Sequence, residues 1–173
     1  MRTRRISAKV DSESGALFSP CRTWRYALWR RWNDEKRANC VAFIGVNPST
    51  ADEKDDDPTI RRCIGFAKSW GYGGLCMLNA YAFCATDPAA LKSATDPIGP
   101  ENDEALLRFT ADSVAIVAAW GRHCGASRAE EVCRLVARPI ECLGRNLSGS
   151  PRHPLYLPAG ARRELYWRPA RTA

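Results

Sequence analysis

Two asparagines stand where their side-chain amides could do chemistry. Asn47 follows the apolar run Cys40–Val46, and Asn79 ends the apolar run Gly74–Asn79. Asparagine is a poor strand residue, but its amide has one acceptor and two donors, which suits holding a water or reading the edge of a nucleobase. Each residue could instead be an ordinary turn or cap asparagine. Because two successive apolar runs lead into an asparagine, we expect a shared polar site.

His153 is one of only two histidines, and it lies between Arg152 and Pro154 in an irregular segment rather than on an apolar face. A loop histidine can donate a hydrogen bond to charge that develops on a leaving group. An exposed histidine without a role is the simpler alternative. The other histidine, His123, precedes Cys124 and could form a Cys–His pair only if both side chains faced the same pocket.

An acidic run, residues 52–57, follows Asn47 closely. Within it, Asp55, Asp56 and Asp57 could hold a divalent cation or provide a general base. The alternative is a solvated loop whose last carboxylate, Asp57, caps a helix beginning at Pro58. A metal is expected only under the first interpretation, and otherwise we expect no metal and no cofactor.

Aromatic and apolar side chains lie close to two of these polar residues. Tyr81 and Phe83 follow Asn79 and could stack on a planar base, while Leu155 and Tyr156 follow His153 and could act as a wedge. Aromatic residues of this kind more often belong to a protein core. The sequence leaves both interpretations open.

The elements that position these residues alternate between strands and helices. Residues 25–32 and 40–46 look like a hairpin that leads into a buried strand. Further strands are predicted at residues 74–79, 113–120 and 140–143. Helices are predicted from residue 58 to a stop at Gly71, and at residues 88–93, 100–111 and 127–137. The alternation predicts a three-layer α/β/α sandwich with a mostly parallel four-stranded sheet. Because ligands bind at the carboxyl edge of such sheets, one pocket could collect Asn47, Asn79 and His153.

The positive charge is concentrated at the two ends. The formal net charge is +7, of which residues 1–10 contribute +4 and residues 162–171 contribute +3. We therefore divide the chain into a basic N-terminal arm (1–20), a single domain (21–160) and a basic C-terminal tail (161–173). Such ends could contact a polyanion such as nucleic acid, although solvated termini are often basic without a partner.

Length and composition exclude several classes of protein. The 173 residues suit one domain, and no apolar stretch approaches the roughly 20 residues that a bilayer span needs. Eight cysteines occur without any C-x-x-C pair, which argues against a zinc site and favours buried structural thiols in a reducing compartment. We expect a cytoplasmic, monomeric protein with no membrane partner.

Four motifs in order resemble the uracil-DNA glycosylase superfamily. The segment Gly45-Val46-Asn47-Pro48-Ser49 is similar to the first motif of its mismatch-specific branch, Gly-Ile-Asn-Pro-Gly. Leu75–Asn79 resembles the strand that ends in a base-reading asparagine, Ile116–Gly121 the strand ending in Trp-Gly, and His153-Pro154-Leu155 the closing His-Pro-Ser loop. The longer string over residues 24–157 resembles an uncharacterised bacterial and phage family, domain of unknown function 1643 (DUF1643).

The resemblance implies a uracil-DNA-glycosylase-like fold and excision of a base from DNA, single- or double-stranded. In such an enzyme the base is flipped out of the stack before the N-glycosidic bond is hydrolysed. Asn47 would hold the water, Asn79 would pair with the base edge, His153 would donate to the departing base, and Tyr81 or Phe83 would stack on it.

Loop residues complete the implied site. Gly45 and Val46 belong to the first motif, and Pro48, Ser49 and Pro154 would shape loops that grip the phosphate backbone. Because Asn47 replaces the carboxylate of the most active branch, the activity is expected to be slow or specialised, on a uracil-like or modified base.

Two other functions are left open by the sequence. The same pocket could belong to a metal-assisted enzyme that acts on a free nucleotide, with Asp55–Asp57 supplying the metal ligands or the base. It could also belong to a non-catalytic nucleic-acid-binding module.

Overall fold

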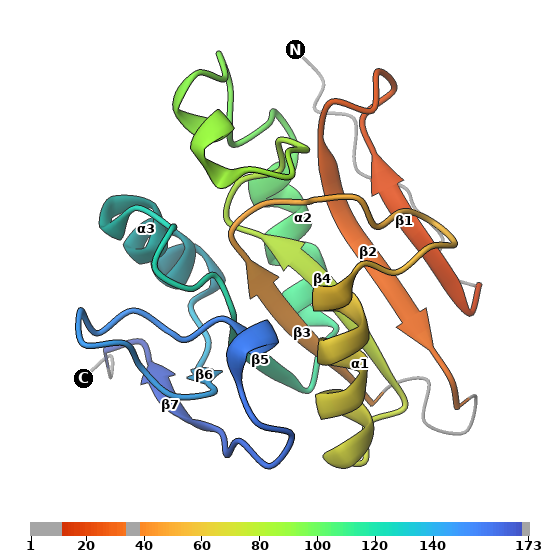
Figure 1. The fold of residues 1–173 in the computed structure, drawn as a ribbon, viewed down its shortest axis with the longest axis vertical. Coiled ribbons are helices and arrows are strands. Elements are labelled where there is room, and N and C mark those ends of the chain that lie inside the picture. The colour runs from red at the N-terminus through yellow and green to blue at the C-terminus, as the bar shows by residue number, and fades with distance from the viewer. Residues whose placement is uncertain (1–11, 34–38, 171–173) are drawn as a thin grey trace.

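The structure is a computed structural model that describes residues 12–33 and 39–170. Within these ranges the chain forms one mixed seven-stranded sheet with helices on both faces (Figure 1). The strands are β1 (Ser14–Phe18), β2 (Arg25–Arg31), β3 (Cys40–Gly45), β4 (Gly74–Asn79), β5 (Ala115–Ala118), β6 (Ile140–Cys142) and β7 (Glu164–Trp167). The helices are α1 (Pro58–Ser69), α2 (Asn102–Ala111) and α3 (Ala126–Val136), with 3-10 turns η2 (Pro88–Lys92) and η3 (Pro154–Tyr156).

The sheet has the order β1-β2-β4-β3-β5-β6-β7. Its centre is parallel, because β3 pairs in parallel with β4 and β5, and β5 with β6. The predicted α/β class and these four parallel strands are therefore confirmed. The prediction of a four-stranded sheet was wrong, since β1 and β2 extend one edge and β7 extends the other, all in antiparallel pairing.

The predicted hairpin between residues 25–32 and 40–46 was also wrong. Both segments are strands, but β4 lies between them and pairs with each. The crossover through α1 brings β4 to one edge of β3, β5 pairs with the other edge, and β2 joins the sheet on the far side of β4. Closeness along the chain is therefore a poor guide to pairing for this strand.

Both faces of the central strands are buried, which explains their continuous apolar sequences. Along β3, Val41 and Phe43 face the core that α1 covers, while Ala42 and Ile44 face the core that α2 and α3 cover. Successive strand side chains point to opposite faces, so each apolar residue has a core to enter. In Figure 1, α1 lies in front of the sheet and α2 behind it.

The loop between β3 and α1 explains the acidic run. The Asp57 Oδ1 atom accepts a hydrogen bond from the Ile60 N–H group at 2.8 Å and caps α1, as the sequence predicts. The Asp52 carboxylate accepts from the backbone N–H groups of residues 54 and 55 at 2.8 Å. Arg30 contacts Asp56 at 2.9 Å. The Asp52 carboxylate thus stabilises the loop, and the Asp57 carboxylate caps the helix that follows it.

The sheet extends beyond the predicted 21–160 domain at both ends. Strand β1 pairs with β2, and β7 pairs with β6, where the ring of Tyr166 packs edge-on against Trp120 with centroids 5.6 Å apart. Residues 164–167 therefore belong to the fold rather than to a separate basic tail. The basic residues predicted to form an arm at 1–10 lie outside the described residues.

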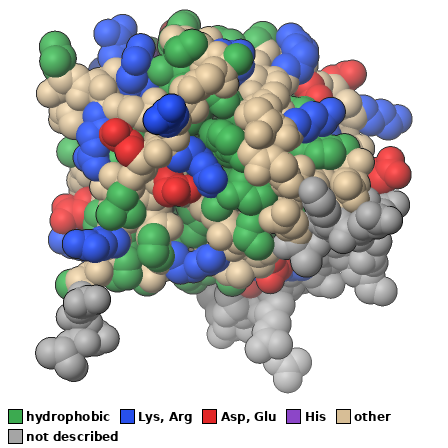
Figure 2. All heavy atoms as spheres, turned by 90° about the horizontal axis from the view of Figure 1, so that it is seen from below, with side chains coloured by type: hydrophobic (Ala, Val, Ile, Leu, Met, Phe, Trp, Pro, Cys, Tyr) green, Lys and Arg blue, Asp and Glu red, His purple; other side chains and the backbone are tan. Residues whose placement is uncertain are grey.

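The lower face of the molecule has mixed character. Figure 2 shows the Lys and Arg side chains of the described residues interspersed there with acidic and hydrophobic ones rather than gathered in one patch. None of the described helices is both long and apolar enough to cross a membrane. The cysteines are free thiols, and Cys40, Cys63, Cys76, Cys133 and Cys142 are buried, as expected for residues that act as small hydrophobes.

Candidate functional site

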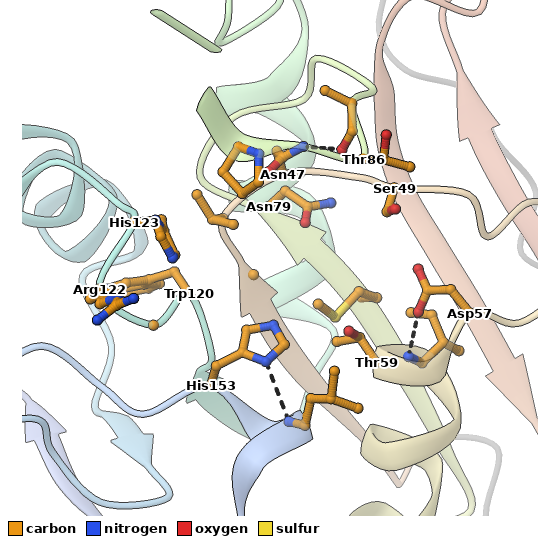
Figure 3. A pocket seen from close by; sticks show the side chains of 18 of the residues that line it. Asn47, Ser49, Asp57, Thr59, Asn79, Thr86, Trp120, Arg122, His123 and His153 are labelled. Atoms are coloured by element: carbon orange, nitrogen blue, oxygen red, sulfur yellow. Dashed lines mark hydrogen bonds between the residues drawn. The ribbon is translucent and has the colours of Figure 1, made fainter. Parts of the chain in front are cut away.

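A pocket of about 570 Å³ opens at the carboxyl ends of the parallel strands. Its lining comes from the segments that follow β3, β4, β5 and β6, together with the start of β2. Figure 3 shows Asn47, Asn79, Trp120 and His153 around this space. Asn47, Asn79 and His153, which the sequence predicts to share one pocket, therefore do line the same pocket.

Most of the predicted site residues line this pocket, and four do not. Those that line it are Gly45, Val46, Asn47, Ser49, Asn79, His153, Leu155 and Tyr156. Those that do not are Pro48, Tyr81, Phe83 and Pro154.

The placement of Tyr81 and Phe83 corrects the expectation that they stack on a base. Tyr81 is half-buried against the core on the α2 and α3 face, with its hydroxyl near Gly125. Phe83 forms an isolated bridge with Trp24. Neither residue lines the pocket, and the buried indole of Trp120 supplies an aromatic wall instead.

Asn79 is the most unusual residue of the site. Its side chain is 0% exposed, and neither Nδ2 nor Oδ1 has a hydrogen-bond partner among the described residues. An unpaired buried polar group costs about 1–3 kcal/mol of stability. A Cβ on Gly45 would lie 3.0 Å from the Asn79 Oδ1 atom, so glycine keeps open the space in front of the amide. The arrangement suits a ligand that supplies the missing partners.

Two buried side chains hold the backbone of Asn79 from behind. Asn102, at the start of α2, donates from Nδ2 to the carbonyl oxygens of Asn79 at 3.0 Å and Ala80 at 3.2 Å. Arg128 on α3 donates to the same Ala80 oxygen at 2.9 Å and pairs with Asp103 at 2.5 Å. Asn102 was not predicted from the sequence, because an asparagine in a first helical turn carries no signal of its contacts.

We expect Asn102→Leu to weaken both the fold and ligand binding. The change leaves the Asn79 carbonyl oxygen without its donor, which should lower the free energy of unfolding by about 2–3 kcal/mol. Urea denaturation measures this loss. An unchanged midpoint of denaturation would show that Asn102 does not secure the end of β4.

Asn47 ties two loops together. Its Nδ2 atom donates to the carbonyl oxygens of Pro48 at 2.9 Å and Ala85 at 2.8 Å. Both amide hydrogens are thereby used, and Oδ1 is the atom left to accept a hydrogen bond from a water. Asn47 combines the turn role expected of a strand-end asparagine with a position in the pocket wall.

His153 is oriented by its own backbone turn. Its Nδ1 atom accepts a hydrogen bond from the Leu155 N–H group at 3.3 Å at the start of η3, which places the proton of the neutral imidazole on Nε2. Gly121, at φ +64°, leaves room for this loop, because a Cβ there would lie 3.3 Å from the His153 Cβ. Figure 3 shows the free ring nitrogen directed toward the pocket.

Burial lowers the pKa of His153, an effect that nearby His123 reinforces and the Asp57 carboxylate opposes. The imidazole is therefore neutral at pH 7. In this form Nε2 is a hydrogen-bond donor and Nδ1 remains the acceptor of its turn. His123 also lines the pocket but is exposed. Cys124 does not line it, so the two side chains do not meet the condition for a Cys–His pair.

This shift makes stability depend on pH in a defined direction. The unfolded chain takes up a proton on His153 near pH 6.5, and the folded chain only at lower pH. The stabilising contribution of the neutral ring is thus complete above about pH 6.5 and is lost as the pH falls through the folded pKa. Denaturation of wild type and His153→Gln from pH 8 to 5 should show a steeper loss in wild type. Parallel curves would contradict this.

Arg25, at the start of β2, was not anticipated from the sequence. Its side chain is 2% exposed and lines the pocket, where it donates from Nη1 to the Ala51 carbonyl oxygen at 2.5 Å. Arg122 and Arg152 lie at the exposed rim. The signal that could have found Arg25 is weak, since a charged residue opening a strand usually faces solvent.

The predicted cation site in the acidic run finds little support. Asp55 and Asp56 do not line the pocket, and Asp57 is engaged as a helix cap. Over the parts of the chain that the structure describes, no group of three or more His, Cys, Asp or Glu side chains could hold a metal ion. The loop interpretation of these carboxylates accounts for their contacts.

Comparison with known proteins identifies a family. Residues 25–155 match the family described as a protein of unknown function, DUF1643, and this segment includes Arg25, Asn47, Asn79 and His153. No curated protein matches the chain, and no solved structure matches it. Because the match spans more than half of the sequence and the whole central sheet, the chain belongs to the DUF1643 family.

Proposed function

We propose that the pocket binds a single flipped nucleobase and that the protein hydrolyses the N-glycosidic bond of a uracil-like or modified base in DNA. The observation that carries this proposal is the buried, unpaired amide of Asn79 at the pocket wall. An amide offers an adjacent donor and acceptor, which match the adjacent carbonyl and N–H groups on the edge of uracil. A base in this position would satisfy both atoms.

The same pocket has the groups that bond cleavage requires. Breaking the bond between C1′ and the base nitrogen sends both electrons to the base, so negative charge develops on its carbonyl oxygen. The Nε2–H group of neutral His153 would donate to that oxygen. The Asn47 Oδ1 atom would accept a hydrogen bond from the water whose oxygen bonds to C1′ and whose proton passes to solvent. The indole of Trp120 adds an apolar wall.

Access to the pocket also fits a nucleic-acid substrate. Leu155 and Tyr156 are 40% and 77% exposed and follow His153 at the rim. Apolar side chains in this position could fill the gap that a flipped base leaves in the stack. Arg122 and Arg152 at the same rim are suited to backbone phosphates.

A second candidate, a non-catalytic nucleic-acid-binding module, has one observation in its favour. Both amide hydrogens of Asn47 are already used by the Pro48 and Ala85 carbonyl oxygens, as in a structural turn. In that case binding should persist in Asn47→Ala and His153→Ala, and no free base should be released by any form of the protein.

Base excision is tested directly with DNA oligomers. Single- and double-stranded oligomers that carry uracil, hydroxymethyluracil or other modified bases are incubated with the protein, and abasic sites are revealed by cleavage in alkali. We expect cleavage by wild type that is reduced in Asn47→Ala and His153→Ala. Binding without cleavage by wild type would favour the binding module, and neither binding nor cleavage across the panel would refute both.

A further inference from the structure

Arg25 is a buried charge that has no counter-ion among the described residues. Two other arginines are comparably buried, and both have carboxylate partners: Arg30 contacts Asp56 at 2.9 Å, and Arg128 contacts Asp103 at 2.5 Å. Among the ion pairs of the described residues, none includes Arg25. A buried charge is expensive unless it is paired, so the missing partner requires an explanation.

The hydrogen bonds of Arg25 leave most of its guanidinium unused. Of its five N–H donors, the described residues engage only Nη1, through the Ala51 carbonyl oxygen, and the buried Nε has no partner. Burial lowers the pKa of Arg25, and the nearby Arg30 adds to that shift. Cys84 and the more distant carboxylates of Asp57 and Asp52 oppose it. Arginine stays protonated in such surroundings, so the charge persists.

The acceptors available in the pocket do not neutralise this charge. Asp57 is the sole acid in the described lining, and its Oδ1 atom accepts the capping hydrogen bond of α1. Arg122 and Arg152 add positive charge at the rim, and no ion pair within the described residues includes them. The pocket is therefore electrostatically suited to an anionic ligand rather than to a neutral base alone.

We propose that Arg25 binds the phosphate group of the nucleotide whose base contacts Asn79. Both side chains line the same pocket of about 570 Å³, and the planar guanidinium fork matches two phosphate oxygens. That the ligand carries a base rests on the proposed function above, whereas the inference that it carries an anionic group rests on the burial and missing ion pair of Arg25. The substrate is then a nucleotide, either free or within a strand, rather than a nucleoside.

Binding of small probes at fixed ionic strength tests this inference. The probes are deoxyuridine, dUMP, 2-deoxyribose 5-phosphate and a single-stranded oligonucleotide with one deoxyuridine, each titrated calorimetrically. We expect wild type to bind a phosphate-bearing probe about 10- to 100-fold more tightly than deoxyuridine. Arg25→Met should abolish that preference, and Arg25→Lys, a point charge without the fork, should retain part of it. Arg22 is exposed, pairs with Glu53 and does not line the pocket, so Arg22→Met should leave the preference unchanged.

The outcomes separate this inference from the proposed function. If the affinity for dUMP falls in the Arg25 variants, Arg25 binds the phosphate of a free nucleotide. If only the affinity for the oligonucleotide falls, Arg25 binds a phosphate of a nucleic-acid strand. Binding of 2-deoxyribose 5-phosphate that requires Arg25, with no base excision, would uphold the phosphate site and refute the glycosylase. Equal affinities for dUMP and deoxyuridine in wild type, with oligonucleotide binding unaffected in both Arg25 variants, would overturn the inference. If Arg25→Met does not fold, Arg25→Lys decides by the same comparison.

Discussion

Asn79→Leu should make the protein more stable and unable to bind its base. Leucine has nearly the shape of asparagine, and it removes an amide that is buried without partners. We expect the free energy of unfolding to rise by about 1–2 kcal/mol, because the desolvation cost of the unpaired amide disappears. Base affinity should fall about 100-fold, since a site built to hydrogen-bond a ligand edge discriminates strongly when those bonds are lost. Urea denaturation and fluorescence anisotropy measure the two effects.

Asn102→Leu is the matched control for this change. It makes the same substitution at a second fully buried asparagine. The Oδ1 atom of Asn102 also has no partner among the described residues, but its Nδ2 atom donates to two backbone oxygens. The two variants should therefore change stability in opposite directions. If Asn79→Leu is destabilised as strongly as Asn102→Leu, the Asn79 amide is a structural group with partners in the folded protein, and its role in reading a ligand is refuted.

His153→Ala should lower the rate of base excision by about 100- to 1,000-fold with little change in DNA affinity. The loss of one preorganised donor to developing negative charge typically has an effect of this size on kcat. Ground-state binding is affected less, because the charge on the base appears only as the bond breaks. Single-turnover excision measured beside equilibrium binding separates the two contributions.

His123→Ala is the matched control, since His123 is the other histidine of the pocket lining. Its ring is exposed and has no assigned role in the chemistry, so its removal should change the single-turnover rate less than a few-fold. Equal losses of rate in the two histidine variants would contradict a specific role for His153.

The centre of the fold was predictable because its signals are local. Long apolar runs with both faces buried, such as Cys40–Gly45 and Gly74–Asn79, indicated parallel strands, and Asp57-Pro58 marked the start of α1. The polar residues at the ends of those runs followed from the same signals. Topology then required them to meet at one edge of the sheet.

There is a physical reason why the edges of the sheet could not be predicted from the sequence. Strand β7, Glu164–Trp167, lies within a segment whose arginines indicated a solvated tail, although the same segment contributes the ring that packs on Trp120. Strand β1 is five residues long and depends on Gly15, where a Cβ would lie 2.3 Å from the Trp29 ring. Such pairings depend on distant partners rather than on local pattern.

The limits of the site prediction have a similar origin. The sequence indicated that Tyr81 and Phe83 follow Asn79, but not which way the chain turns after β4. It also carried no sign that Arg25 is buried without an ion-pair partner, because its side-chain hydrogen bond reaches the Ala51 carbonyl oxygen, 26 residues away in the sequence. The direction of a side chain and the balance of buried charge both require the assembled fold.

The most direct test of the central claim follows the Asn79 side-chain amide itself. In ¹H–¹⁵N spectra of the protein, assigned by comparison with Asn79→Leu, the Nδ2 hydrogens are observed while oligonucleotides of the excision panel are added. We predict that the recognised base shifts these resonances and protects them from exchange with solvent, since an unpaired amide acquires a partner. Oligonucleotide binding that leaves the Asn79 amide resonances unchanged would contradict the account.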